Sequence, residues 1–337
     1  MLVILLFLST LIAFSSPKCE ESVILPLKTN DLTQVLDQVL LPRPSDEEIM
    51  NARCKTKSAP SLKEMESFIN GNTSLIKTEI INGVSIKNES PIAIEAFKDL
   101  TTNKDFFFNT LMKENQTQIQ SKYSINPSCA KALCAVKKIW GDELGTKILY
   151  LKMRYGINSS ELAYSDEDMT AERFKIDEID DIIMAIADLP KDYQSLFKNK
   201  PIIHMVLKKD IPTNIANASI IVFNKWVEQS RAQRQFAIYH ELIHNISSHK
   251  NEICESKDWR ALSGWSSKNN GKSWEYDLEK ECFATNYAKK NSSEDFAESA
   301  TVYRYAPEKF KEKCPKKYQF IKNKLFNNIE YTTDDCK

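Results

Sequence analysis

The sequence predicts an α+β fold that is mostly helical, with a small mixed sheet in its C-terminal half. Apolar residues recur at helical spacing, and the clearest stripe consists of Phe174, Ile176, Ile179, Ile182, Ile183 and Ile186. Two short runs of β-branched and aromatic residues, 202–207 and 219–223, have the composition of strands. The stretch 226–248 then returns to the helical period. The 337 residues are enough for roughly two domains of ~100–200 residues each.

We assign residues 129–337 to a C-terminal domain, because the periodic segments begin there. Besides the long helix, the expected helices cover 129–140, 142–154 and 171–187. The first two should be separated near Gly141, since glycine weakens a helix interior. The third should stop before Pro190, because the residue that precedes a proline disfavours the helical conformation.

Residues 16–128 form an N-terminal region whose role the sequence leaves open between a propeptide, a docking domain and a lid. Its first part, 17–60, is rich in turn formers and predicts a loosely structured lead-in. The segment 78–87 predicts a β-hairpin, because the dipeptide Asn82-Gly83 separates two β-prone runs. No motif with recognisable chemistry occurs in this region.

Residues 1–15 have the features of a signal peptide. The apolar run is shorter than the ~20 residues that a membrane-spanning helix needs, so no stable membrane span is expected. The small residues Ala13 and Ser15 have the spacing of a cleavage site, which predicts cleavage after Ser15 and a secreted or periplasmic protein. A buried N-terminal helix is one alternative. A lipid anchor on Cys19 is another, although Lys18 stands where a small residue would be expected.

The cysteine content agrees with export, because an even number of cysteines in an oxidising compartment can pair. The eight cysteines are Cys19, Cys54, Cys129, Cys134, Cys254, Cys282, Cys314 and Cys336. Cys129 and Cys134 are close enough for a local bridge, and Cys314 with Cys336 would tie down the C-terminal tail. No CxxC pair occurs, which disfavours a zinc ribbon.

Charge and composition exclude two classes of function. The 46 basic and 46 acidic side chains give a formal net charge of zero, so no basic field indicates a nucleic-acid partner. Only 7 glycines are present, and neither GxxxxGK nor GxGxxG occurs, so no phosphate-binding loop is expected.

The segment HELIH at 240–244 matches the metal-binding pattern HExxH. His240 and His244 are four positions apart, so on a helix both imidazoles face one side and can bind one ion. Glu241 lies one step around the helix, where it can take a proton from a metal-bound water. Zinc lowers the pKa of such a water from about 15.7 toward about 7, which makes a hydroxide-like nucleophile available at neutral pH.

The third metal ligand must come from elsewhere in the chain. A metzincin would carry glycine and histidine at the positions of Ser247 and Lys250, so that class is excluded. A glutamate from a second helix is the alternative, and Glu294 and Glu298 share one helical face. Two serines can cap this helix, Ser292 and Ser293. One carboxylate can bind the metal while the other orients a ligand imidazole, and the residues alone leave open which is which.

The strand predicted at 219–223 directly precedes the HELIH helix, which is the order found in zincin peptidases. We expect it to be an edge strand, to which an extended substrate can add through main-chain hydrogen bonds. The sequence therefore predicts a secreted zinc metallopeptidase that acts on a protein or peptide, with Glu241 as general base. One alternative is a zinc amide hydrolase of cell-wall peptides. Another is an inactive zinc-binding adhesion or interaction protein, which would have no need of Glu241.

Two further patterns resemble the peptidase domain of anthrax toxin lethal factor and its secreted bacterial relatives. The first is YxxxNxxExFAE at 287–298, and the second is PKKYQFI at 315–321. The resemblance covers residues 170–329, whereas the half before Cys129 shows none. It implies a zincin-like catalytic domain with a small mixed sheet, two zinc-binding helices and one zinc ion per chain.

The resemblance also implies roles for the site residues. His240 and His244 become zinc ligands, and Glu294 becomes the third ligand. Glu298 becomes the carboxylate that supports a ligand imidazole from behind, and Glu241 becomes the general base. The implied reaction is direct attack by water, without a covalent intermediate.

Tyr287 becomes, through the same resemblance, the phenol that donates a hydrogen bond near zinc and stabilises the oxyanion. The residues alone give no reason to prefer it over Tyr303 or Tyr305. Ser292 departs from the proline that many relatives carry, and we expect this to affect only the start of the helix.

Overall fold

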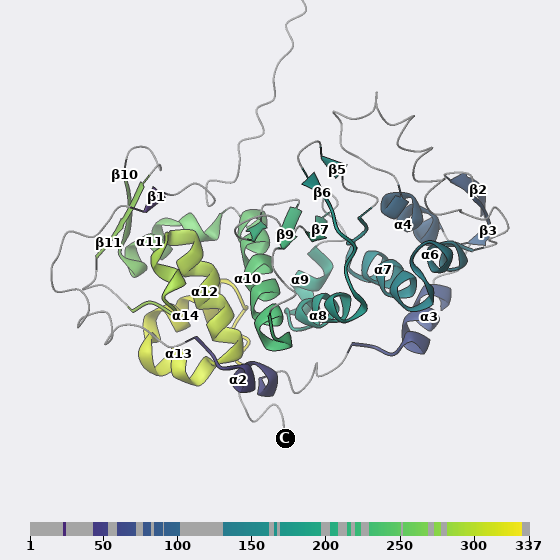
Figure 1. The fold of residues 1–337 in the computed structure, drawn as a ribbon. Helices are drawn as coiled ribbons and strands as arrows, with labels where there is room; N and C mark the ends of the chain where they lie inside the picture. The colour runs from purple at the N-terminus through teal and green to yellow at the C-terminus, as the bar shows by residue number, and fades with distance from the viewer. Residues whose placement is uncertain are drawn as a thin grey trace, which may run out of the picture.

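The computed structural model describes most of the chain between Arg43 and Tyr331, together with one short strand near the N-terminus (Figure 1). The described residues are 23–24, 43–52, 59–71, 77–81, 84–89, 91–101, 131–161, 165–166, 169–196, 203–207, 214–216, 220–223, 229–250, 252–268, 273–277 and 282–331. This part of the chain is mostly helical and carries small sheets, which agrees with the α+β prediction. None of its helices is both long and apolar enough to cross a membrane. The predicted signal peptide at 1–15 lies outside the described residues.

The N-terminal elements are α2 (Asp46–Asn51), α3 (Leu62–Gly71), β2 (Lys77–Ile81), β3 (Val84–Glu89) and α4 (Pro91–Thr101). Ser45 caps α2, because its hydroxyl accepts from the backbone N–H of Glu48 at 3.2 Å. The antiparallel pairing of β2 with β3 confirms the predicted hairpin, with Ile81 opposite Val84. The Asn82-Gly83 turn lies outside the described residues.

Helices α6 (Ala132–Trp140) and α7 (Asp142–Tyr155) confirm the predicted pair and the break between them. Gly141 joins them with a φ of 89°, which residues with a Cβ rarely adopt. Gly145 permits their close approach, because a Cβ at this position would lie 2.4 Å from the backbone oxygen of Val136.

Helix α8 (Ile176–Ala187) begins later than the predicted start at residue 171. Glu172 forms an antiparallel bridge with Leu207, so the chain is still extended where a helix was expected. The backbone N–H of Lys175 then donates to the carboxylate of Glu178 at 2.7 Å, which stabilises the helix start. The short elements around α8 are β5 (Ser165–Asp166), β6 (Met169–Thr170) and α9 (Lys191–Leu196).

The largest sheet has the strand order β4-β7-β9-β8. Its strands are β4 (Ile157–Asn158), β7 (Ile203–Leu207), β9 (Ile220–Phe223) and β8 (Ile215–Ala216). The first three are parallel, and β8 runs antiparallel to β9. The prediction that 219–223 forms an edge strand was wrong, because the short strand β8 folds back and pairs with β9. Among the described residues, β8 is therefore the edge of this sheet.

Helix α10 (Arg231–His249) carries the HELIH segment and starts five residues later than predicted. Ser230 has an extended backbone and accepts from the N–H of Gln233 at 3.1 Å, so the helix begins directly after it. The following elements are η4 (Ile253–Glu255), α11 (Lys257–Ser263), β10 (Trp265–Lys268) and β11 (Ser273–Tyr276). Strand β1 (Val23–Ile24) pairs in parallel with β11.

Helix α12 (Ser292–Tyr305) carries both candidate glutamates. The prediction that Ser292 or Ser293 caps it was wrong. Instead, the side chain of Asn291 accepts from the backbone N–H of Glu294 at 2.8 Å, while the two serines have helical positions and other partners. The remaining elements are η6 (Tyr287–Lys289), α13 (Pro307–Lys313) and α14 (Pro315–Lys324).

Helices α10 and α12 lie side by side in the C-terminal half of the molecule (Figure 1). Tyr239 of α10 packs edge-on against Tyr305 of α12, with ring centroids 5.4 Å apart. Phe236 contacts the same ring at 6.2 Å. These buried rings fix the C-terminal end of α12 against the middle of α10.

A fully buried ion pair joins α12 to α14. Both side chains of Asp295 and Lys317 are 0% exposed, and the Lys317 Nζ donates to each Asp295 oxygen at 2.8 Å. The indole N–H of Trp265 donates to Asp295 at 2.9 Å. Because Asp295 directly follows Glu294, this pair fixes the helix next to the candidate ligand.

A disulfide between Cys282 and Cys314, with Cα atoms 5.7 Å apart, ties the segment before η6 to the start of α14. The expected bridge from Cys314 to Cys336 was therefore wrong, since Cys314 has this other partner. Cys134 is a free thiol, so the expected local bridge to Cys129 was also wrong. Spacing along the chain suggested both pairings, whereas the fold brings together cysteines 32 residues apart.

We expect Lys317→Met to destabilise the protein by about 3–5 kcal/mol, because it leaves the Asp295 charge buried without a partner. Urea unfolding monitored by circular dichroism measures this loss. The double variant Asp295→Leu/Lys317→Met should recover much of it. The control Lys322→Met breaks a partly exposed pair with Glu330 and should cost at most about 1 kcal/mol. Equal losses for the two single lysine variants would contradict the assignment.

Candidate metal site

The two histidines of the HELIH segment lie on one face of α10, as their spacing predicts. The Nε2 atoms of His240 and His244 are 3.0 Å apart. Both side chains are largely buried, with 7% and 14% of their surface exposed. Two ring nitrogens are thus directed at the same small volume.

Glu294 of α12 adds a third atom to this volume. Its Oε2 lies 3.0 Å from the Nε2 of His240 and 3.1 Å from the Nε2 of His244. In a tetrahedral zinc site with ligand distances of about 2.0–2.1 Å, neighbouring donor atoms are about 3.3–3.4 Å apart. The three atoms therefore have close to the spacing of three ligands around one ion, and two imidazoles with one carboxylate are a donor set that zinc uses.

Glu241 belongs to the same cluster as the two histidines. His240, Glu241 and His244 each present one donor atom, and these atoms all lie within 4.8 Å of one another, so the group could hold a metal ion. The Glu241 side chain also hydrogen-bonds to Asn214, which directly precedes β8. Burial raises the pKa of Glu241 above its usual value, although the neighbouring histidines oppose the rise. A carboxylate with a raised pKa next to a metal position suits a general base.

The second ring nitrogen of each histidine has a polar neighbour. The Nδ1 of His240 lies 2.8 Å from Oε1 of Glu298, whose other oxygen accepts a short hydrogen bond from the hydroxyl of Thr285. The Nδ1 of His244 lies 3.0 Å from the hydroxyl of Ser293. A proton on Nδ1 that is donated to these oxygens leaves the Nε2 lone pairs available for a metal.

The environment gives Glu294 and His240 opposite pKa shifts. Burial alone would raise the pKa of Glu294, but the hydrogen bonds and charges of His240 and His244 outweigh it and hold that pKa well below its usual value. Burial alone would lower the pKa of His240, but Glu294 and Glu298 outweigh it and raise the pKa well above its usual value. Glu294 is thus ionised, which a metal ligand requires.

The short segment before α12 presents Tyr287 and Lys290 to this site. Tyr287 is 43% exposed, and its hydroxyl donates to Oε1 of Glu294 at 3.3 Å. Its ring centroid is 5.9 Å from that of His240. Tyr303 and Tyr305, by contrast, are buried, and their hydroxyls donate to the carbonyl oxygen of Ile329 and to the Asp188 carboxylate, not to the site. Of these three tyrosines, Tyr287 is the one that reaches the site.

Lys290 was not singled out in the sequence, although its Nζ lies 3.1 Å from the Tyr287 hydroxyl and 3.2 Å from Glu294 Oε1. Burial alone would lower the pKa of Lys290, but Glu294 and Tyr287 outweigh it and raise the pKa. In the sequence, the only feature that could have identified Lys290 is its position three residues after Tyr287 and four before Glu294. The sequence predicted Ser293 as a helix cap but did not indicate the contact of its hydroxyl with His244.

Two hydrogen bonds hold the start of α12 against η4 and α11. The Ser292 hydroxyl donates to the carbonyl oxygen of Cys254 at 2.8 Å. The indole N–H of Trp259 donates to the carbonyl oxygen of Ser292 at 3.2 Å. Together with the Asn291 cap, these bonds fix the turn that directs Glu294 toward α10.

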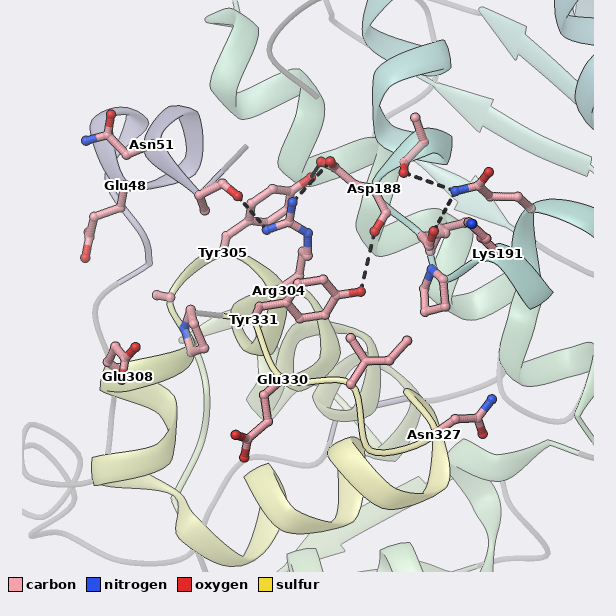
Figure 2. Close-up of a pocket in the computed structure, with 18 of the residues that line it drawn as sticks. Glu48, Asn51, Asp188, Lys191, Arg304, Tyr305, Glu308, Asn327, Glu330 and Tyr331 are labelled. Carbon is pink, nitrogen blue, oxygen red and sulfur yellow. Dashed lines mark hydrogen bonds and ion pairs between the residues drawn. The ribbon is translucent and has the colours of Figure 1, made fainter. Parts of the chain in front are cut away.

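A cavity of about 820 Å³ lies at the other end of α12, between α2, α8 and the segment after α14 (Figure 2). Arg304 and Asp188 form an ion pair in it at 3.1 Å, and the Tyr305 hydroxyl donates to the same aspartate at 3.3 Å. The helix from Glu294 to Tyr305 rises by eleven residue steps, which separates the cavity from the candidate metal site by about 16 Å. Among the described residues, the metal-type cluster is on α10 and not in this cavity.

No family model, curated protein or solved structure matches the chain. The interpretation of the site therefore depends on its geometry. That geometry brings together all six predicted site residues: His240, Glu241, His244, Tyr287, Glu294 and Glu298.

We expect Glu294→Ala to abolish tight zinc binding, because it removes one of three convergent donor atoms. Glu298→Ala should weaken binding by only about 10–100-fold, since it removes a partner of the ligand His240. Competition with a chromophoric chelator gives both dissociation constants, and melting curves of the metal-free variants control for misfolding. Equal effects of the two substitutions would contradict the assignment of Glu294 as the ligand.

Proposed function

We propose that the chain is a zinc-dependent metallopeptidase that hydrolyses peptide bonds with water. The observation that supports this best is the convergence of donor atoms from His240, His244 and Glu294, at 3.0–3.1 Å, beside the buried carboxylate of Glu241. A zinc ion held by these three residues would activate a water molecule and polarise the scissile carbonyl.

The residues around this position supply the remaining parts of a hydrolysis. The oxygen of the attacking water bonds to the carbonyl carbon. At the same time, Glu241 accepts a proton from this water. Tyr287 donates a hydrogen bond to the oxygen on which negative charge develops. Glu241 then passes its proton to the leaving nitrogen, and the C–N bond breaks. The products are a carboxylate and an amine, and no covalent intermediate with the protein is formed.

The edge strand β8 favours a peptide as the substrate. Strand β8 packs against α10, and Asn214 directly before it contacts Glu241, so this edge borders the site. Its outer side has no strand partner among the described residues. A substrate that adds an extended strand here would gain main-chain hydrogen bonds without regard to its sequence.

We also propose that the chain is related to the lethal-factor peptidase domain and has a zincin-like catalytic fold. The order of α10, then Tyr287, then Glu294 and Glu298 on α12, and finally α14 supports this relation. Glu298 contacts Nδ1 of His240, the ring nitrogen that does not face Glu294. This contact agrees with the role that the resemblance gives Glu298.

We expect the purified protein to hold one zinc ion per chain, and Glu241→Gln to retain the metal while losing at least about 100-fold in kcat. Hydrolysis of unfolded casein measures the activity, and atomic emission measures the metal. Glu241 is not one of the three convergent donors, so metal and activity should separate in this variant.

Purified protein without stoichiometric zinc would refute the proposal. Hydrolysis of peptidoglycan fragments without hydrolysis of casein would instead favour the cell-wall amide hydrolase. If neither substrate is cleaved and Glu241→Gln leaves every property unchanged, the protein is a zinc-binding interaction protein.

We further propose that the protein is exported, and we expect the mature chain to begin at Ser16. The disulfide between Cys282 and Cys314 supports export, because such bonds persist in oxidising compartments. N-terminal sequencing of the protein recovered outside the cytoplasm measures the cleavage point. A chain that retains residues 1–15 would contradict the signal peptide, and lipid on Cys19 would identify the anchor alternative.

A further inference from the structure

Lys290 contacts two groups of the site at once. It lies at the end of η6, where its backbone N–H donates to the carbonyl oxygen of Tyr287 at 3.1 Å. Its Nζ donates to the Tyr287 hydroxyl at 3.1 Å and to Oε1 of Glu294 at 3.2 Å. The three polar atoms form a triangle, because Tyr287 also donates to Oε1 of Glu294 at 3.3 Å.

The two oxygens of Glu294 therefore have separate environments. Oε2 faces the two histidines, while Oε1 is turned to Lys290 and Tyr287. A carboxylate with both oxygens free can bind a metal through either one or both. The ammonium group of Lys290 holds Oε1 by a charge-assisted hydrogen bond, which directs Oε2 alone to the metal position.

The same ammonium group sets the direction of the Tyr287 hydroxyl. An ammonium group has donors but no acceptor, so the phenol oxygen accepts from Lys290 and its own hydrogen must point elsewhere. In the structure this hydrogen is donated to Oε1 of Glu294. When a substrate oxygen approaches, the same hydrogen can be donated to it, and the positive charge behind the phenol favours negative charge on that oxygen.

The ion pair of Lys290 with Glu294 differs from an ordinary ion pair on a helix surface. Pairs of exposed side chains four residues apart contribute little to stability. The Glu294 side chain is only 13% exposed, that of Lys290 is 35% exposed, and the Nζ also lies 5.0 Å from the centre of the Tyr287 ring. The lysine is thus held between Glu294 and the phenol, with about a third of its side chain still exposed.

We infer that Lys290 is a positioning residue of the proposed peptidase, which keeps Glu294 bound through one oxygen and directs the Tyr287 hydroxyl at the substrate oxyanion. This inference rests on the proposed function for its effect on catalysis. The effect on Glu294 requires only that the site binds a metal.

The test compares Lys290→Met, Lys290→Arg and the control Lys322→Met in the full-length mature protein. The control removes the same charge from another partly exposed pair, that of Lys322 with Glu330 at 2.6 Å. Two quantities are measured. The first is kcat and KM for casein hydrolysis by the zinc form. The second is the intensity of the visible absorption of the cobalt(II) form, which falls when a ligand set changes from four to five donor atoms.

We expect Lys290→Met to lower kcat by about 10–100-fold while KM changes by less than about threefold, since the residue acts through others. The cobalt absorption should weaken as the second oxygen of Glu294 becomes free to bind. Lys290→Arg should keep most of kcat and the spectrum, and Lys322→Met should match the wild type. In the Tyr287→Phe background, Lys290→Met should lower kcat by less than it does in the wild type, because only the effect through Glu294 remains.

An unchanged kcat or an unchanged cobalt spectrum in Lys290→Met would overturn the inference. An equally large loss of kcat in the Tyr287→Phe background would do so too, because the lysine would then not act through the phenol. If Lys290→Met fails to fold, the cobalt(II) absorption of Lys290→Arg is compared with that of the wild type. Loss of this absorption in Lys290→Arg overturns the inference. A wild type that binds cobalt but cleaves no casein refutes the peptidase proposal, and the spectrum still tests the contact with Glu294.

Discussion

The structure around the site depends on one constraint, which is that α10 and α12 hold three electron-rich atoms within 3.0–3.1 Å of one another. Such atoms can stay this close only where a proton or a metal ion lies between them, because without that positive charge they would repel each other in a buried site. The surrounding fold must therefore hold the two helices together. Aromatic packing of Tyr239 on Tyr305 fixes one end of α12, and the buried pair of Asp295 with Lys317 fixes the other.

Two glutamates of the site have opposite pKa shifts because their surroundings differ. Glu294 faces both imidazoles, whose hydrogen bonds and charges outweigh its burial and lower its pKa. Glu241 is also buried, but it lies beside the imidazoles, and burial raises its pKa. One carboxylate is thus kept ionised, as a metal ligand must be, while burial makes the other hold a proton more readily than an ordinary glutamate does. The division follows from position on two helices and not from residue type.

The sequence was sufficient for features that depend on regular spacing. The helical period predicted α10 and placed His240 and His244 on one face, and the Asn-Gly dipeptide predicted the β2–β3 hairpin. It did not reveal β8, because two residues carry no periodic signal. It also misplaced the cap of α12, since three adjacent polar residues can each act as caps and tertiary contacts decide among them. Lys290 could not be found, because its contacts depend on the turn of η6.

The exposure of the site residues differs in a way that bears on how a substrate completes the site. Glu241 is 7% exposed, whereas Tyr287 is 43% exposed and has water on one side. A phenol in water stabilises an oxyanion weakly, because water competes for both groups. In the proposed peptidase, a peptide that pairs with β8 and extends over Tyr287 and Lys290 would remove water from both side chains. In the proposed peptidase, the base is thus buried before the substrate binds, whereas the oxyanion donor gains its strength only once the substrate is in place, so we expect hydrolysis to be favoured for chains long enough to cover both.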